Sequence, residues 1–127
     1  MFEIFRRRAP KKPQASSQYP LFTAKCRMGV TPLRAENVQV DTASMRDVSL
    51  SILTNGNLII YDENAGKVYD FFAVREIRDA KREDTPDAAA HEVVLVTSRK
   101  NIHFFFSSHE EKNIFWTVFQ YVRNREA

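Results

Sequence analysis

Cysteine, glycine and long apolar runs are scarce in this sequence of 127 residues. Cys26 is the single cysteine, which excludes an internal disulfide and any metal site built from cysteines. The three glycines lie far apart and form no glycine-rich phosphate loop. Apolar runs such as residues 102–106 are too short to cross a bilayer, and three arginines follow residues 2–5 where a secretory signal would stay apolar. We therefore expect no transmembrane segment and a reducing cellular environment.

Residue sets for catalysis or metal binding are also lacking. The three histidines match no metal-ligand spacing. They are His91, His103 and His109. The paired acids at 62–63 and 110–111 are explained by a turn and by the start of a helix. Cys26 falls on the core face of a predicted strand, where a thiol is buried rather than nucleophilic. The sequence therefore predicts a protein that is not an enzyme and that has no cofactor and no metal.

The formal charge of +3 is unevenly distributed along the chain. Residues 1–14 carry five basic side chains and one acidic one, for +4, and the remainder carries 14 basic and 15 acidic side chains, for −1. A nucleic-acid-binding domain usually has its positive charge on the fold. We therefore expect a basic arm over residues 1–19, and a nearly neutral domain over residues 20–127 for which nucleic acid is not the expected partner.

The arm combines apolar and basic side chains. Its candidate contacts with a membrane or another acidic surface are Phe2, Phe5, Arg6, Arg7, Arg8, Lys11 and Lys12. Each basic residue close to an anionic membrane contributes roughly 1 kcal/mol of attraction, and inserted phenylalanines add to it. A solvated start of the chain without fixed structure, a nuclear-localisation signal and an RNA contact are the alternatives.

The hydrophobic pattern has a period of two over most of the domain, which is typical of strands. In residues 21–30 the core face comprises Phe22, Ala24, Cys26, Met28 and Val30, and Lys25 and Arg27 face outward. Two further strands, 48–53 and 58–61, flank Asn55-Gly56, which predicts a type I′ hairpin turn. A second turn at 62–66 leads to a strand at 67–74 that we expect to continue through residue 77. Residues 36–40 are a weaker candidate for an extension of the sheet.

The second half of the domain reads as a loop, two strands and a helix. Residues 78–90 are polar and predict a surface loop, and strands follow at 91–97 and 102–106. Ser108 and Glu111 form a capping-box pattern that marks the start of the helix. The expected buried stripe of the helix is Phe115, Val118, Phe119 and Val122, widened by Ile114 and Tyr121.

This order of elements resembles the pleckstrin-homology (PH) superfamily. Residues 48–62, with their Asn55-Gly56 turn, are similar to the second and third strands of that family, and 68–77 to its fourth. Residues 102–106 and the helix from 107 through 121 are similar to its last strand and its helix. The resemblance implies a mainly β fold, an antiparallel sandwich or barrel capped by one C-terminal α-helix. It also implies a eukaryotic, cytoplasmic setting, associated with a membrane or the cytoskeleton.

The resemblance implies a non-catalytic module for targeting or scaffolding that acts through protein–protein contacts. A partner could occupy a groove beside the helix, or add a strand to a sheet edge. The alternative function is phosphoinositide-dependent recruitment to membranes. The cations that match the lipid-headgroup region of the family are Lys25, Arg27, Arg34 and Arg46. The acids at 36, 41 and 47 interrupt them, so we expect weak binding of inositol phosphates or none.

Trp116 is the candidate protein contact on the helix. The spacing of the helical stripe gives Phe115 the core position, and the next residue points roughly 100° away. We therefore expect Trp116 at the edge of the core or outside it, beside Lys112 and Gln120. An exposed tryptophan there would be an anchor for a protein partner, and the alternative is packing against the arm or a loop.

Overall fold

The computed structural model describes residues 19–33, 40–82 and 91–126. The strands are β1 (Pro20–Pro32), β2 (Arg46–Leu53), β3 (Asn57–Asp62), β4 (Lys67–Ala73), β5 (Asp79–Arg82), β6 (Glu92–Val96) and β7 (Lys100–Phe105). Two short 3-10 helices, η1 (Thr42–Ser44) and η2 (Val74–Glu76), and one long helix, α2 (His109–Glu126), complete these residues. None of the helices in them has the length and apolar character needed to cross a bilayer.

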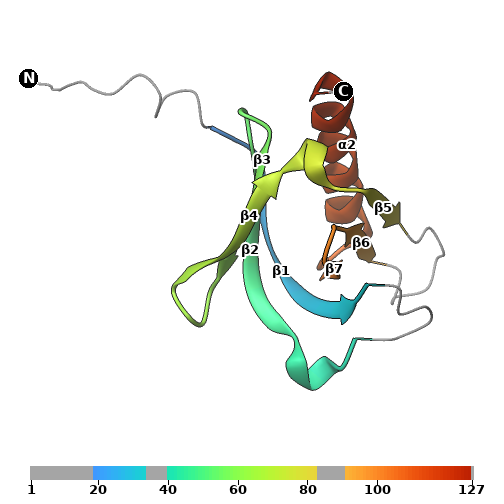
Figure 1. The fold of residues 1–127 in the computed structure, drawn as a ribbon. Helices are drawn as coiled ribbons and strands as arrows, with labels where there is room; N and C mark the ends of the chain where they lie inside the picture. Colours follow the sequence, from blue (N-terminus) through green and yellow to red (C-terminus); the bar gives the residue numbers. More distant parts are fainter. Residues whose placement is uncertain (1–18, 34–39, 83–90, 127) are drawn as a thin grey trace, which may run out of the picture.

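The strands form one antiparallel sheet in the order β4-β3-β2-β1-β7-β6-β5. Strand β1 is central because its first part pairs with β2 and its last part pairs with β7. Figure 1 shows β1 and β2 curving strongly, so that the sheet bends around the core, which α2 covers. The predicted mainly β fold with one C-terminal helix is confirmed.

The core is an aromatic and aliphatic cluster between the sheet and α2. Phe115 of α2 lies at its centre, with ring centroids of neighbouring phenylalanines 5.2–6.4 Å away. Those neighbours are Phe22, Phe104, Phe106 and Phe119. Val122 is fully buried on the same helical stripe and Val118 packs partly buried against the core, as the 3.6-residue period predicts.

The helix departs from the prediction on its flanks. Ile114 and Tyr121 were expected to widen the buried stripe, but half or more of each side chain is exposed. Lys112 is instead fully buried. It lies three residues before Phe115, so it extends the same stripe toward the helix start. Ser108 caps the helix as predicted, because its Oγ accepts a hydrogen bond from the Glu111 N–H at 3.1 Å.

Turns and strand ends differ in detail from the predictions. The β2–β3 loop has three residues, since the Gly56 N–H donates to the Leu53 carbonyl and Gly56 has a φ of 89°. This excludes the predicted two-residue type I′ turn. Strand β4 ends at Ala73 and η2 begins at Val74, so the strand does not continue through residue 77. The predicted loop at 78–90 contains β5 at its start. Within 36–40, residues 36–39 lie outside the described residues, and Val40 belongs to no strand.

The two edge strands have their own hydrogen-bond acceptors. In β4, Asp70 Oδ1 accepts from the Phe71 N–H at 2.8 Å. In β5, Asp79 Oδ1 accepts from the Ala80 N–H at 2.9 Å. An unpaired strand edge normally offers such N–H groups to another chain. Here the carboxylate of the preceding residue takes up one of these N–H groups in each edge strand.

Candidate binding surfaces

The open end of the sheet, where β1 ends and β2 begins, holds two cations around one ring, and we call it the mouth. The Arg46 guanidinium lies 4.8 Å from the centre of the Tyr69 ring, and Lys100 Nζ lies 4.9 Å from it. Each cation also has a carboxylate. Arg46 Nη1 donates to Asp62 Oδ2 at 2.8 Å, and Lys100 Nζ lies 3.6 Å from Asp70 Oδ2. An anionic ligand at the mouth would therefore compete with two carboxylates already in place.

Asp62 is held in its charged form. Its Oδ1 accepts from the N–H groups of Asn64 and Ala65 at 3.0 Å each. The hydrogen bond from Ala65, followed by that from Arg46, lowers the pKa of the Asp62 carboxyl below 3.8. Asp62 thereby fixes both the β3–β4 turn and the direction of the Arg46 side chain.

The mouth itself is narrow. A cavity of about 200 Å³ lies there, below the 300–1,000 Å³ typical of ligand pockets. Its lining is Met28, Gly29, Val30, Ser44, Arg46 and Tyr69. Val30 was expected in the core. It does share the face of Met28, but it lies where the core ends and is 38% exposed.

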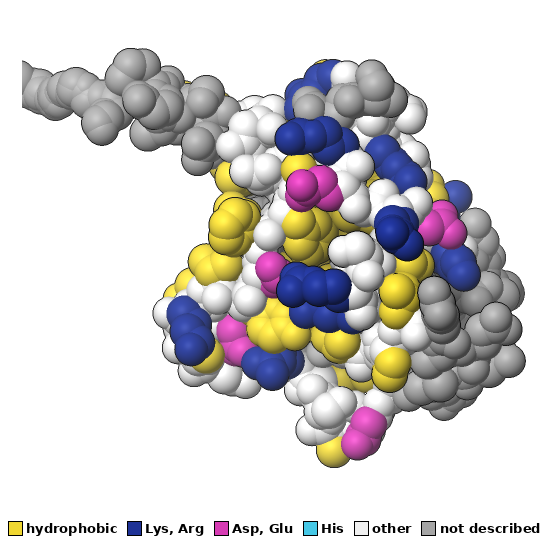
Figure 2. Space-filling view, in the orientation of Figure 1, with side chains coloured by type: hydrophobic (Ala, Val, Ile, Leu, Met, Phe, Trp, Pro, Cys, Tyr) yellow, Lys and Arg dark blue, Asp and Glu magenta, His cyan; other side chains and the backbone are white. Residues whose placement is uncertain are grey.

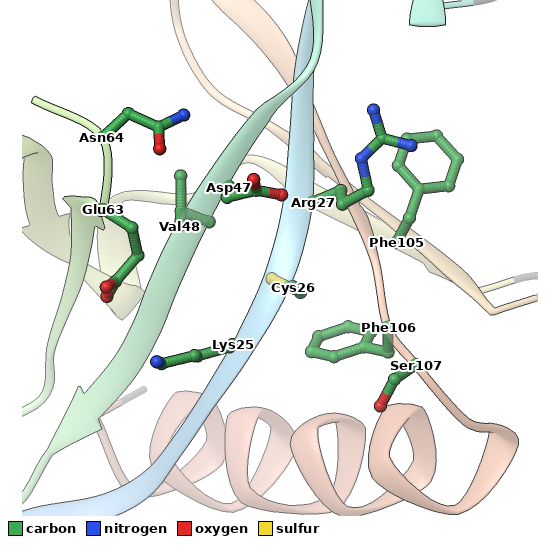
Figure 3. Close-up of a pocket in the computed structure, with 10 residues that line it drawn as sticks. All are labelled: Lys25, Cys26, Arg27, Asp47, Val48, Glu63, Asn64, Phe105, Phe106 and Ser107. Atoms are coloured by element: carbon green, nitrogen blue, oxygen red, sulfur yellow. The ribbon is translucent and has the colours of Figure 1, made fainter.

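A larger cavity of about 540 Å³ opens where β1 leaves β7. Its lining is Lys25, Cys26, Arg27, Asp47, Val48, Glu63, Asn64, Phe105, Phe106 and Ser107. Figure 3 shows Lys25 directed toward β2 and Arg27 directed toward β7, where it lies beside the ring of its cross-strand neighbour Phe105. The two cations do not converge on one point, and Asp47 and Glu63 balance their charge. This arrangement does not favour a polyanionic headgroup.

Cys26 lies in the wall of this cavity and is buried, as predicted. Burial, and to a lesser extent the charge of Glu111, raises the pKa of the Cys26 thiol to about 12. The thiolate is the nucleophile in cysteine chemistry, so this side chain is inert at neutral pH.

An exposed apolar surface covers the outer face of β3 and β4. Ile59 pairs with Phe71 and Tyr61 pairs with Val68, so all four side chains share one face. Phe71 is 65% exposed, Val68 49% and Tyr61 37%. We call these four residues the β3–β4 apolar surface. Exposed apolar patches of this kind mark contacts with other macromolecules. These four residues were not singled out from the sequence, although the alternation of 58–61 and 67–74 could have shown that they share a face.

Trp116 is half-buried at the edge of the core. Its ring centroid lies 6.3 Å from that of Phe119, and the Arg82 guanidinium of β5 lies 5.0 Å from the centre of its ring. The expected position at the core edge is therefore found, with cover from β5. The role of Trp116 as a protein contact stays a prediction.

A chain of polar side chains links three strands on the outer face of the sheet. Thr31 Oγ1 lies 2.8 Å from His103 Nε2, and His103 Nδ1 lies 2.6 Å from Glu92 Oε2. A hydroxyl, an imidazole and a carboxylate in this order resemble a nucleophilic triad. Thr31 and His103 are buried, however, so a substrate could not reach the hydroxyl. These hydrogen-bonded side chains instead link β1, β7 and β6. The sequence gives no sign of it, because the three residues meet only through strand pairing.

Several predicted contacts lie outside the described residues. They are Phe2, Phe5, Arg6, Arg7, Arg8, Lys11, Lys12 and Arg34. Among the described residues, no group of three histidine, cysteine or acidic side chains is placed to hold a metal ion.

Solved structures share this arrangement of strands and helix. The C-terminal domain of an unknown protein from Leishmania infantum matches with a TM-score of 0.59 and 12% identity, over 87% of this chain and 89% of that one. The PH domain from TgAPH matches with a TM-score of 0.50 and 10% identity, over 76% and 79%. This chain has a PH-like fold. Vav1, solved with an allosteric inhibitor, also contains a PH domain and matches with a TM-score of 0.63 and 15% identity.

The PH-like likeness to Vav1 covers 90% of this chain but only 29% of the Vav1 chain, so the two share a domain and not a whole architecture. No family model matches the sequence, and no curated protein sequence matches it. At these identities the comparisons show the fold alone. PH-like folds are generally non-catalytic and generally mediate contacts with proteins or lipids.

Proposed function

We propose that this chain is a non-catalytic PH-like interaction module that acts in targeting or scaffolding through protein–protein contacts. The observation that carries the proposal is the β3–β4 apolar surface, with Phe71 65% exposed on an edge strand. Large aromatic side chains are common anchors of protein interfaces. We propose that a partner covers Phe71, Tyr61 and Val68.

The mode of docking follows from the edge of β4. Addition of a strand to this edge was one expected mode. Asp70 Oδ1 already accepts from the Phe71 N–H, so strand addition would have to break that bond. A partner that packs side chains on the outer face meets no such cost. The proposal therefore favours a side-chain interface over strand addition.

The test compares two exposed apolar residues on different faces. Phe71→Ser removes the centre of the β3–β4 apolar surface, and Ile114→Ser changes a half-exposed residue on the outer side of α2. Proteins cross-linked to the wild-type chain in cells are identified and compared with those of each variant. Loss of specific partners with Phe71→Ser but not with Ile114→Ser supports the proposal. Retention of all partners by Phe71→Ser contradicts it.

Phosphoinositide-dependent recruitment is the second candidate. It is favoured by the approach of Arg46 and Lys100 to the same Tyr69 ring. It is disfavoured because Asp62 and Asp70 pair with these cations. Titration calorimetry of the full chain with soluble inositol phosphates separates the two candidates. We expect weak binding or none, and submicromolar, headgroup-specific binding would reverse the order.

The basic arm adds an electrostatic contact with anionic membranes in this proposal. Its five cations within residues 6–12 follow Phe2, Ile4 and Phe5. The attraction is coulombic, so it should weaken as salt shortens the screening length from ~10 Å at 0.1 M to ~3 Å at 1 M. The proposed location is the cytoplasm, at a membrane or the cytoskeleton.

A further inference from the structure

A cavity of about 320 Å³ lies beside β4, one of the two edge strands of the sheet. Its walls come from β4, from the end of η2 and the residue after it, and from the turn between β6 and β7. We call it the edge cavity, and its lining is Asp70, Phe71, Phe72, Glu76, Ile77, Thr97, Ser98 and Arg99. Figure 2, in the orientation of Figure 1, shows hydrophobic and acidic side chains next to one another between β4 and β6, with basic side chains around them. Phe71 also belongs to the β3–β4 apolar surface, so the cavity and that surface are continuous.

On the β4 side, both carboxylates of the lining accept hydrogen bonds from the open edge of the strand. Asp70 Oδ1 accepts from the Phe71 N–H at 2.8 Å, and Glu76 Oε1 accepts from the Ala73 N–H at 3.1 Å. A carboxylate has two oxygens and can accept about four hydrogen bonds. Asp70 and Glu76 therefore keep accepting capacity after they have bound these two N–H groups.

On the opposite wall, backbone donors of the β6–β7 turn are also engaged. The N–H groups of Arg99 and Lys100 both donate to Thr97 Oγ1, at 3.2 Å each. The Thr97 hydroxyl in turn donates to the Lys100 carbonyl at 2.9 Å. Four backbone N–H groups around the cavity are thus already bonded within the domain. A ligand that must accept hydrogen bonds would have to displace one of these bonds, or use the Ser98 hydroxyl or the Arg99 guanidinium.

The charge of the lining is negative. Asp70 and Glu76 supply two carboxylates and Arg99 supplies one guanidinium, which gives −1. Lys100 lies outside the lining, and its Nζ is 3.6 Å from Asp70 Oδ2, which is longer than a hydrogen bond. Lys100 also faces the Tyr69 ring at the mouth, so it offsets the Asp70 charge only from that side. The edge cavity therefore favours a cationic ligand over an anionic one.

The walls fit the guanidinium group of an arginine side chain. This group has five N–H donors and no acceptor, so it complements carboxylates that still have lone pairs. It is also planar and stacks on aromatic rings, which Phe71 and Phe72 supply in the lining. At about 320 Å³ the cavity is near the lower end of the 300–1,000 Å³ range of ligand sites, which suits one side chain better than a whole cofactor.

We propose that the edge cavity binds an arginine side chain of a protein partner, while apolar residues next to that arginine cover the β3–β4 apolar surface. The inference rests on the proposed function, and it names the chemistry of the partner for that same surface. Asp70 Oδ1 can keep its bond to the Phe71 N–H while Oδ2 receives the guanidinium. The strand edge thus stays protected when the partner binds, which agrees with docking through side chains and not through strand addition.

The test uses the full chain and two small probes, N-acetyl-arginine amide and N-acetyl-citrulline amide. Citrulline has nearly the same shape as arginine but carries no charge. Amide chemical shifts in NMR spectra are followed as each probe is added. We expect the arginine probe to bind with a roughly millimolar dissociation constant, as a ligand of this size would, and to shift the signals of Phe71, Thr97 and Ser98. The citrulline probe should bind several-fold more weakly, because the charge-assisted hydrogen bonds are lost.

Two isosteric variants remove charge from the cavity without removing the acceptors of the strand edge. In Asp70→Asn and Glu76→Gln, a side-chain oxygen remains to accept the backbone N–H. Each should weaken binding of the arginine probe about two- to fivefold with little change in melting temperature. Asp79→Asn is the matched control, because Asp79 accepts from the Ala80 N–H of the other edge strand and does not line the cavity. It should bind the probe like the wild type. Arg99→Ala removes the competing cation and should strengthen binding.

The same variants connect the cavity with partners in cells. Proteins whose cross-linking is lost with Phe71→Ser should also be lost with the double variant Asp70→Asn/Glu76→Gln, and they should be kept with Asp79→Asn. Retention of these proteins by the double variant would contradict the inference and leave the proposed function in place.

Three outcomes of the probe titrations would overturn the inference. The first is equal binding of the arginine and citrulline probes, a comparison that needs no variant and so decides even if a variant unfolds. The second is equal binding of the arginine probe by Asp70→Asn/Glu76→Gln and by Asp79→Asn. The third is weaker binding by Arg99→Ala, which would show that Arg99 attracts the probe instead of competing with its cation.

The failure of the inference and that of the proposed function are distinguishable. If any of the three outcomes occurs while Phe71→Ser still loses its protein partners, the inference fails and the proposed function stands. If the arginine probe binds as expected but Phe71→Ser keeps all its partners, the proposed function fails, and with it the partner inferred for the edge cavity.

Discussion

Removal of the Phe115 ring should be the most destabilising single truncation in helix α2. Phe115 is fully buried, and four other phenylalanine rings surround it within 6.4 Å. A buried Phe→Ala change costs about 3–5 kcal/mol. The whole domain is expected to have about 5–15 kcal/mol of stability. Phe115→Ala should therefore remove a large part of the free energy of unfolding.

Urea unfolding followed by tryptophan fluorescence measures this loss. A cost of about 4 kcal/mol and an m value of about 2 kcal/mol/M predict a midpoint lower by about 2 M. Ile114→Ala is the matched control, because Ile114 is the preceding residue and half of it is exposed. It should shift the midpoint only slightly. Equal midpoints for the two variants would refute the helix register and the position of α2 on the sheet.

Three further perturbations test other features. Asp70→Ala frees the Phe71 N–H at the β4 edge, so we expect the variant to associate through this edge. Light scattering should show a mean mass that increases with protein concentration. A variant that stays monomeric would contradict the role of Asp70 in protecting the edge. Burial raises the pKa of Cys26 from 9.0 to about 12, so the unfolded thiol loses its proton first and stability should fall as pH rises from 9 toward 12. In urea titrations, the unfolding free energy of Cys26→Ala should lack this decrease between pH 9 and pH 12. The pKa of Asp62 is lowered, mainly by the Ala65 N–H, so its contribution to stability is present above pH 3.8 and is lost as the pH falls further. The difference in unfolding free energy between wild type and Asp62→Asn should therefore shrink in acid.

The strands were predictable because alternation of apolar and polar residues is a local signal. The 48–53 and 58–61 predictions lie within β2 and β3, and the 102–106 prediction overlaps β7. Strand β5 was missed because Asp79–Arg82 is short, polar and only half-buried. It is a strand because it pairs with β6, and that pairing is not visible in its own sequence.

The helix shows the limit of a periodic pattern. Phe115 and Phe119 were placed correctly, but the width of the buried stripe was overestimated. Ile114 and Tyr121 are apolar and exposed, and Lys112 is charged and buried. Residue type predicts burial only on average, and the position of α2 against a curved sheet decides the individual case.

The sequence identifies the charged residues of the candidate sites but not the ion pairs that they form. The sequence names Arg46 as a candidate cation, but its pairing with Asp62 depends on the β3–β4 turn. The β3–β4 apolar surface likewise arises from a register that places Phe71 beside Ile59. Arg123 of α2 donates to the Arg78 carbonyl before β5, and only the folded structure brings these two distant residues together.

The central position of β1 has a consequence for the order of folding. This strand leaves the ribosome first among the described strands, and it pairs on one side with β2 and on the other with β7. The partners on the β7 side, such as Gly29 and His103, are separated by most of the domain. Contacts of such long sequence separation form slowly, because a large loop must close first. The hairpins β2–β3 and β6–β7 are local and should form earlier, so the strand that is synthesised first is the last to be fully paired.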